Sequence, residues 1–297
     1  MGNVAKFRQE LPDLAQIKSR TQSEIIWRHL RNDPIAVIGV LIVISWIGLA
    51  LFAPSIAPQD PLKQSVSERL QAPGELFRMG SDELGRDIFS RVLYGGRITI
   101  PAALAVVLID SIIGTIIGAL AGFIGGIWDE ILMRLTELFM AFPTIILAMA
   151  ITAALGPDIR NAVLALIIVR WPSYARLTRG LVLEAKNEDY VEATRSLGAS
   201  DAYILVRTLL PNTIAPALIY ASLDIGNAIL LFAGLSFLGL GPEPASPEWG
   251  RMVSIGIDFF DQWWMWLFPG LAIASLVMAF NFIGDRLRDI LDPRSRK

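Results

Sequence analysis

The sequence of 297 residues contains no cysteine, a single histidine, His29, and only 18% charged residues. The absence of cysteine excludes a disulfide scaffold, a thiolate zinc site and a cysteine nucleophile. One histidine leaves almost nothing for histidine-based catalysis or metal binding. The formal net charge of −2 gives no indication of a nucleic-acid partner.

Apolar residues are abundant where charges are scarce. They make up 54% of the sequence, and the mean hydropathy is +0.52. A soluble domain carries about 25% charged residues, so a soluble chain of this size could not cover its surface with so few. Disordered chains are polar and highly charged, and the same figures exclude disorder. The composition therefore predicts an integral membrane protein in contact with membrane lipid.

Six mostly apolar runs have about the length that a helix needs to cross a bilayer, roughly 20 residues. They are continuously apolar and rich in Ala, Leu and Ile, which favours helices over the alternating strands of a barrel. We therefore expect an all-α membrane protein with six transmembrane helices. The runs are 35–52, 98–128, 138–157, 162–177, 212–242 and 262–284. In the second run, Gly114, Gly118 and Gly122 recur at the spacing of close helix packing.

The Lys and Arg residues between the runs predict the orientation, because positive residues concentrate on the cytoplasmic side. With both termini inside, the inner segments hold 16 Lys or Arg residues and the outer segments hold 8, which favours N-in, C-in. The inner segments are 1–34, 176–211 and 285–297, and the outer ones are 54–97, 156–161 and 241–262. The first run is longer than the apolar region of a signal peptide, about 7–15 residues, and is expected to be a retained anchor.

Three further features are expected near the membrane surfaces. A short cytoplasmic helix is expected over 23–30. In the first outer segment, Ser81 or Asp82 is expected to cap a surface helix. Its apolar stripe would consist of Ile88, Val92 and Leu93. At the start of the sixth run, a tryptophan cluster suits an outer interfacial belt. That cluster consists of Trp263, Trp264 and Trp266.

The polar segment 176–211 predicts a helix–glycine–helix elbow on the cytoplasmic side. Asn187 is expected to cap a first helix over 189–197, with acidic residues in its first turn. Gly198 then supplies a stop with positive φ.

Ser200 is expected to cap the second helix of the elbow, over 201–210, and Pro211 to begin the turn back to the membrane. An elbow that is joined to a transmembrane helix at each end can transmit a displacement from outside the membrane to the helices within it. On spacing alone, an ordinary solvated hairpin is the alternative interpretation.

This elbow resembles the EAA loop of the permease subunits of binding-protein-dependent ABC importers. Thr194 and Thr208 stand where that pattern usually has Ala and Ile. The residues that carry the pattern are Glu192, Ala193, Thr194, Gly198, Ala199, Leu210 and Pro211. Residues 80–87, with 90–91 and 94–95, resemble the segment before the second span in the dipeptide/oligopeptide/nickel group. Residues 235–241, 247–250 and 281–293 resemble the "C" permease subunit of that group.

The resemblance implies both a fold and a multi-subunit transporter. Such subunits have six helices and pair with a homologous B-type permease. Two cytoplasmic ATPases bind below, an extracytoplasmic solute-binding protein docks above, and the EAA loop is the coupling helix. The sequence has no Gly-x-x-x-x-Gly-Lys-Ser/Thr loop. We therefore expect a transport subunit of the bacterial inner membrane that is not an enzyme and binds no cofactor, with ATP and Mg held by the partner ATPases. The solutes implied are small peptides or related compounds.

The same resemblance divides the chain into four parts. Residues 1–33 would be a cytoplasmic segment, and 34–93 would hold the first transmembrane helix and the outer loop. Residues 94–285 would form the ABC transmembrane type-1 domain, and 286–297 a cytoplasmic tail.

Asp110, Arg170 and Asp224 lie near mid-depth of the expected spans. An unpaired charge there costs at least about 2.5–3.5 kcal/mol, so we expect Arg170 to pair with Asp224 or with Asp110. The alternative is that the three groups face an aqueous path and are solvated separately. These charges also support a rival function, an ion-coupled secondary transporter. For a second rival, a membrane-embedded hydrolase, only the Asp110 and Asp224 pair would be available.

Overall fold

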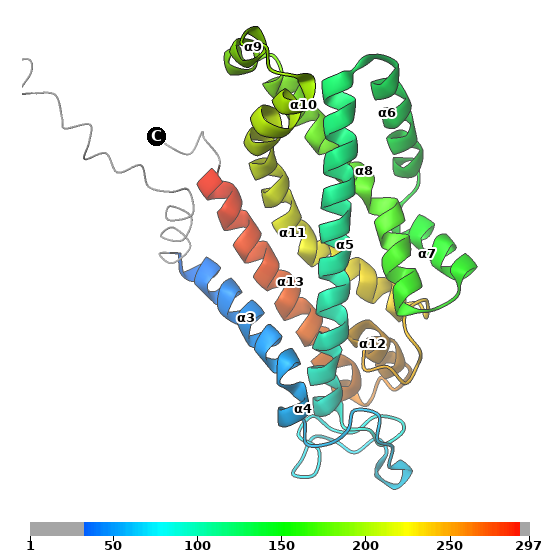
Figure 1. Cartoon of the computed structure of the whole chain (residues 1–297). Helices are drawn as coiled ribbons and strands as arrows, with labels where there is room; N and C mark the ends of the chain where they lie inside the picture. Colours follow the sequence, from blue (N-terminus) through cyan, green and yellow to red (C-terminus); the bar gives the residue numbers. More distant parts are fainter. Residues whose placement is uncertain (1–32, 292–297) are drawn as a thin grey trace, which may run out of the picture.

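The computed structural model describes residues 33–291, and this part of the chain is an all-helical bundle (Figure 1). The helix expected over 23–30 lies outside the described residues. The helices are α3 (Pro34–Leu51), α4 (Ala53–Ile56), η2 (Val66–Glu68), α5 (Ile88–Ile124), α6 (Gly126–Met140), α7 (Thr144–Leu155), α8 (Ile159–Ala185), α9 (Asp189–Ser196), α10 (Asp201–Tyr203), η3 (Ile204–Leu209), α11 (Leu210–Phe237), α12 (Trp249–Asp258) and α13 (Trp263–Leu291).

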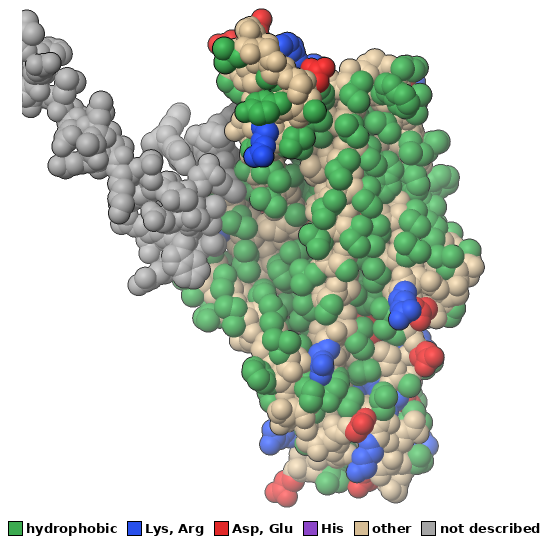
Figure 2. Space-filling view, in the orientation of Figure 1, with side chains coloured by type: hydrophobic (Ala, Val, Ile, Leu, Met, Phe, Trp, Pro, Cys, Tyr) green, Lys and Arg blue, Asp and Glu red, His purple; other side chains and the backbone are tan. Residues whose placement is uncertain are grey.

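Four of the described helices are long and apolar enough to cross a membrane, and a bent pair of helices would make a fifth crossing. The four are Pro34–Leu51, Ile88–Ile124, Asp201–Phe237 and Trp263–Ile290, and the bent pair is α6 with α7. Apolar side chains cover the flank of the bundle that faces the viewer, whereas many charged side chains gather on α9 and toward the opposite end (Figure 2). This distribution suits a bundle whose flank lies in hydrocarbon.

The run 138–157, expected as one helix, is broken in the structure. α6 ends at Met140, α7 begins at Thr144, and the two axes differ by 86°. Pro143 has no N–H to donate and disfavours helical geometry at Phe142, so the helix cannot continue through this point. With 12 residues, α7 is only about 18 Å long and does not cross a membrane by itself.

The second expected run has different bounds in the structure. α5 extends from Ile88 to Ile124, and Gly125 and Gly126 reverse the chain with φ of 71° and 60°. Trp128 therefore belongs to α6.

The expected surface helix is the first part of α5 and is continuous with the candidate span. Its cap is Asp87, which accepts a hydrogen bond from the Ser90 N–H at 2.8 Å. Caps at Ser81 or Asp82 were therefore wrong, because both residues lie in the turn before Asp87.

α8 contains the fourth expected run, 162–177, but is not among the candidate spans, because its arginines lower its hydropathy. α8 packs along α5 at the glycine positions (Figure 1). A Cβ on Gly114 would lie 2.5 Å from the Trp171 carbonyl oxygen, and one on Gly118 would overlap the Ala175 carbonyl oxygen. The close packing expected from the glycine spacing is confirmed.

α3 lies beside α13 at the edge of the bundle (Figure 1). Asp33 caps α3 by accepting hydrogen bonds from the N–H groups of Ile35 and Ala36 at 2.9 and 3.0 Å, and it forms an ion pair with Arg286 of α13. These contacts hold the two ends of the described chain together.

The segment between α4 and α5, which we call the 57–87 loop, is folded against the bundle. Trp264 is buried beneath it and donates its indole N–H to the Ser81 carbonyl oxygen at 3.1 Å. The expectation that Trp264 belongs to an interfacial belt was therefore wrong, whereas Trp263 is 45% exposed. Because the indole N–H already has a hydrogen-bond acceptor inside the protein, it does not require one at the membrane interface.

Candidate functional site

Arg170 of α8 lies between two buried carboxylates from different helices. Its Nε donates to Asp110 Oδ2 in α5 at 3.3 Å, and its Nη2 pairs with Asp224 Oδ2 in α11. Asp110 is 0% exposed, Asp224 5% and Arg170 7%. The expected direct pairing is confirmed, and it includes both carboxylates. Helices α5, α8 and α11 are thereby joined at one point, which we call the Arg170 cluster.

Two further residues, neither of them predicted from the sequence, complete the Arg170 cluster. The Tyr174 hydroxyl donates to Asp224 Oδ2 at 2.9 Å, and Asn227 Nδ2 lies 3.5 Å from Asp224 Oδ1. Tyr174 follows Arg170 by four residues and Asn227 follows Asp224 by three. Residues at these separations are neighbours on a helix surface, and this spacing could have identified them.

A cavity of about 140 Å³ opens beside the Arg170 cluster. The bend between α6 and α7 forms one wall, and α8 and α11 form the others. Its apolar lining consists of Phe139, Met140, Phe142, Val169 and Leu231, and its polar lining consists of Thr144, Arg170, Ser173, Tyr220, Asp224 and Asn227. The bend that contradicts a straight third helix therefore lines a cavity with both apolar and polar groups.

The elbow lies at the end of the bundle opposite the 57–87 loop (Figure 1). Gly198 has φ of 81°, as the stop between the two helices requires, and Ser200 caps the next helix by accepting from the Tyr203 N–H at 3.3 Å. The cap of α9 is Glu188, not Asn187. Asn187 instead donates its side-chain N–H to the Leu183 carbonyl oxygen at 3.3 Å, so its amide is turned back toward α8.

The second arm of the elbow continues into the bundle without a turn. α10 passes into the π-helical segment η3 and then into α11, so the expected turn at Pro211 was wrong. Pro211 lies in the first turn of α11, where a proline is tolerated. Just before it, the Leu210 N–H donates to the Leu205 carbonyl oxygen, five residues back. This wider turn precedes the point where proline can donate no hydrogen bond.

The residues of the EAA pattern divide between two surfaces. Glu192, Ala193, Gly198 and Pro211 are exposed, whereas Ala199 and Leu210 pack against a buried cluster. That cluster consists of Ala119, Val182, Val191, Ile204 and Leu209. Thr194 is half-buried and satisfies its hydroxyl on the Tyr190 carbonyl oxygen at 2.7 Å. Leu197, next to Gly198, is 88% exposed. The elbow is thus anchored on α5 and α8 and presents its tip to the surroundings.

Two basic residues, Arg179 of α8 and Lys186 at its C-cap, fasten the elbow end of this helix to neighbouring helices. Arg179 makes a bidentate pair with Asp129 of α6, with Nε–Oδ1 and Nη2–Oδ2 distances of 2.6 and 2.7 Å. Lys186 donates to the carbonyl oxygens of Gly122 and Phe123 at the end of α5, at 3.2 and 3.3 Å. A cation suits these otherwise unpaired terminal carbonyls.

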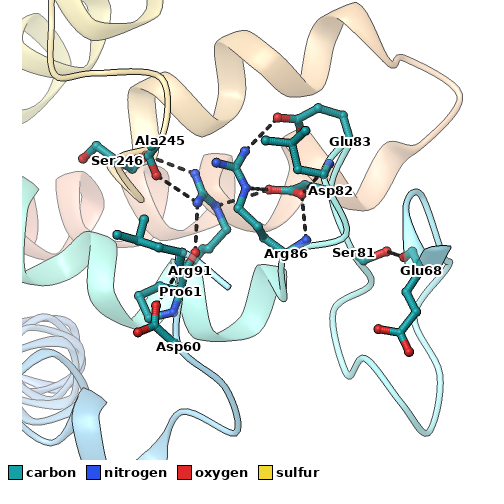
Figure 3. Close-up of polar contacts among 12 residues, drawn as sticks. Asp60, Pro61, Glu68, Ser81, Asp82, Glu83, Arg86, Arg91, Ala245 and Ser246 are labelled. Carbon is teal, nitrogen blue, oxygen red and sulfur yellow. Dashed lines mark hydrogen bonds and ion pairs between the residues drawn. The ribbon is translucent and has the colours of Figure 1, made fainter. Parts of the chain in front are cut away.

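A buried polar network fastens the 57–87 loop to the bundle (Figure 3). Arg91 of α5 is 1% exposed and donates to the carbonyl oxygens of Pro61, Ala245 and Ser246 at 3.0–3.1 Å. Its Nε lies 3.5 Å from Asp82 Oδ2. One guanidinium thus joins the loop to the connection between α11 and α12.

Arg86 and Glu83 complete this network (Figure 3). Arg86 pairs with Asp82 at 2.6 Å and with Glu83 at 2.7 Å. Burial raises the pKa of the Glu83 carboxyl, and the neighbouring Asp82 carboxylate raises it further.

Comparison with known proteins supplies the family. Residues 114–297 match the family described as binding-protein-dependent transport system inner membrane component, which is more than half of the chain. The chain belongs to this family. Residues 21–73 also match the N-terminal TM domain of oligopeptide transport permease C.

Several relatives align with nearly the whole chain. The glutathione transport system permease protein GsiD of Escherichia coli O6:K15:H31 is 43% identical over 277 residues, covering 93% of this chain and 91% of the relative. The probable D,D-dipeptide transport system permease protein DdpC of Escherichia coli K12 is 42% identical over 274 residues, covering 92% of each. The dipeptide transport system permease protein DppC of Haemophilus influenzae is 37% identical over 285 residues, covering 94% and 97%. The family member described here is therefore a permease subunit of an ABC importer in the bacterial inner membrane, a transport subunit and not an enzyme.

Proposed function

We propose that this permease is the C-type subunit of an ATP-driven importer of small peptides or related solutes. It forms half of the translocation path, and a homologous B-type permease forms the other half. Two cytoplasmic ATPases bind ATP and Mg, and an extracytoplasmic solute-binding protein delivers the solute. The names of the relatives, which include dipeptide and glutathione permeases, support this solute class.

The proposed membrane arrangement has six crossings, with both termini in the cytoplasm. Four are the long apolar helices, one is the bent pair α6–α7, and the sixth is α8. α8 has 27 residues and is about 40 Å long, enough to cross. Its central arginine is compatible with a bilayer because Asp110 and Asp224 pair with it.

The observation that carries the coupling role is the geometry of the elbow over 187–211. Gly198 separates two helical arms with φ of 81°, and the second arm runs without a break into α11. α11 carries Asp224 and therefore reaches the Arg170 cluster. We infer that the exposed tip, including Glu192 and Leu197, contacts one ATPase. A displacement of this tip would then move α11 as a rigid body. Membership in a binding-protein-dependent family favours this mechanism over ion-coupled transport.

Substitution of Gly198 tests the coupling role. A Cβ at Gly198 would meet no atom within 4 Å, so a substitution there acts through backbone strain alone. A β-branched residue with positive φ costs roughly 1 kcal/mol or more, whereas asparagine tolerates this conformation. Gly198→Val is expected to insert normally but to bind the ATPases weakly or to lose transport-linked ATP hydrolysis. Gly198→Asn, the matched control, is expected to retain both.

The measurement is co-purification of the ATPases with the tagged permease, together with solute-stimulated ATP hydrolysis in proteoliposomes. If Gly198→Val retains its ATPases and transports at the wild-type rate, the elbow is not the coupling element.

A further inference from the structure

The cavity beside the Arg170 cluster holds hydrogen-bonding capacity that the protein does not use. Asp224 Oδ2 accepts from Arg170 and from Tyr174, whereas Oδ1 has only Asn227 Nδ2 at 3.5 Å, the limit of a hydrogen bond. An ionised carboxylate has about four acceptor sites on its two oxygens. Oδ1 is the oxygen beside Asn227, and both residues line the cavity, so we infer that a guest would meet this side of the carboxylate.

The size of the cavity limits what it can hold. Its volume of about 140 Å³ has room for several water molecules. It is smaller than the roughly 300–1,000 Å³ of a site that encloses a whole small ligand. The chain therefore supplies a site for one end of a solute, and the remainder of the solute must contact another surface.

The residues that line the cavity indicate which end of a solute fits into it. Arg170 also lines the cavity, but its one positive charge is paired with two carboxylates, Asp110 and Asp224. A carboxylate oxygen with spare capacity, beside an amide and two hydroxyls (Ser173 and Tyr220), suits an N–H donor that carries a positive charge. The apolar wall of Phe139 and Phe142 suits the adjoining carbon atoms. Among the described residues, no group of three or more His, Cys, Asp and Glu side chains could hold a metal ion. The lining thus favours an organic ammonium group over a bare metal cation.

We propose that Asp224 and Asn227 form a subsite for the amino-terminal ammonium group of a peptide passing through the importer. The proposal rests on the proposed function, because the partner permease must complete the site. In this arrangement Arg170 and Tyr174 act as positioning residues. They occupy Oδ2 of Asp224 and leave the acceptor capacity of Oδ1 for the solute.

Thiol labelling in the assembled importer tests the charge preference of the cavity. Ser173→Cys places the only cysteine of this chain in the lining. In proteoliposomes, labelling by the cationic reagent 2-aminoethyl methanethiosulfonate is compared with labelling by its anionic 2-sulfonatoethyl counterpart. Both rates are normalised to Ser67→Cys, an exposed position of the 57–87 loop. The cationic reagent is expected to be favoured by about tenfold, the ratio for one charge-assisted hydrogen bond.

Three substitutions, each combined with Ser173→Cys, identify the group responsible for the charge preference. Asp224→Asn is expected to abolish the preference. Asp261→Asn, the matched control, is expected to retain it, because Asp261 is exposed and does not line the cavity. Asn227→Asp adds a carboxylate beside Oδ1 and is expected to increase the preference, so the proposal stays testable if Asp224→Asn does not fold. Labelling with no charge preference, or equal preference in all variants, overturns the proposal.

The solute class is tested by protection from labelling. Millimolar alanyl-alanine is expected to slow the labelling of Ser173→Cys, whereas N-acetyl-alanyl-alanine, which lacks the ammonium group, is not. Equal protection by both peptides, or by neither, contradicts the subsite. Peptide import by the same proteoliposomes is measured in parallel. Import without selective protection overturns the subsite alone, whereas failure of the wild-type importer to take up any peptide overturns the proposed function.

Discussion

Gly118 of α5 lies directly against the backbone of Ala175 in α8, where a Cβ on the glycine would overlap the alanine carbonyl oxygen. A flexible side chain could move aside, but a helix backbone cannot do so without moving its neighbours. The contact therefore sets the separation of the two helices. Because Asp110 lies on α5 and Arg170 on α8, this separation also sets the distance between their side chains.

Gly118→Val is expected to destabilise the protein, because α5 and α8 must move apart to admit the side chain. Overpacking of this kind costs roughly 1–3 kcal/mol. Gly180→Ala is the control, since a Cβ at that position of α8 would meet nothing within 4 Å. Thermal unfolding in detergent, followed by tryptophan fluorescence, measures both variants. An unchanged unfolding temperature for Gly118→Val would show that the helices are not in this contact.

Arg91→Met is expected to release the 57–87 loop, because it leaves three carbonyl oxygens and the Asp82 carboxylate without this donor. Removing one partner of a buried charged group costs about 3–5 kcal/mol. The measurement is the rate of trypsin cleavage at the exposed Lys63, Arg69 and Arg78. Arg97→Met, on the exposed side of the same helix, is expected to leave the rate unchanged. Equal cleavage of the two variants would argue against the fastening role of Arg91.

Glu248 is expected to make the stability of the protein depend on pH. It caps α12 from a fully buried position, and burial raises the pKa of its carboxyl above the ordinary value of 4.5. At pH values between 4.5 and the raised pKa of the folded state, the folded protein binds more protons than the unfolded chain. The free energy of unfolding therefore falls as pH rises through this window.

Glu248→Gln removes the titrating carboxyl, and the stability of this variant is expected to fall less steeply as pH rises. The unfolding temperature is measured from pH 4.5, the ordinary value, upward. Glu243→Gln, at an exposed position of the same connection, is the control and should keep the wild-type slope. A Glu248→Gln profile parallel to that of the wild type would contradict the assignment.

Asn187→Cys reports the orientation of the elbow, and the native sequence supplies no competing cysteine. The residue is exposed. In intact cells, a membrane-impermeant thiol reagent is expected to leave Asn187→Cys unmodified and to label Ser67→Cys in the 57–87 loop. After permeabilisation both should react. Labelling of Asn187→Cys from outside would reverse the proposed topology.

Local rules predicted several features of the fold from the sequence. The Gly198 stop and the Ser200 cap each depend on a few consecutive residues, and both are present. The bend between α6 and α7 also has a local cause in Pro143, but the apolar composition of 138–157 concealed it. Composition identifies residues that suit hydrocarbon and does not identify where a helix must break.

Other features depend on contacts between residues far apart in the chain. Trp264 lies beneath the 57–87 loop because its N–H meets Ser81, which is 183 residues away. Arg91 reaches Ser246 across 155 residues. Neither contact leaves a signal at a helical or strand spacing, so sequence patterns placed Trp264 at the membrane surface.

The Arg170 cluster shows where the two kinds of information divide. Two conclusions follow from the residues alone: the protein is a helical membrane protein, and a charge at mid-span needs a partner. Both rest on the cost of placing single residues in hydrocarbon. The pairing of Arg170 with both Asp110 and Asp224, with Tyr174 as a further donor, depends instead on how the helices pack. That choice depends on how closely α5, α8 and α11 approach one another, and the approach is set by backbone contacts such as that of Gly118 with Ala175.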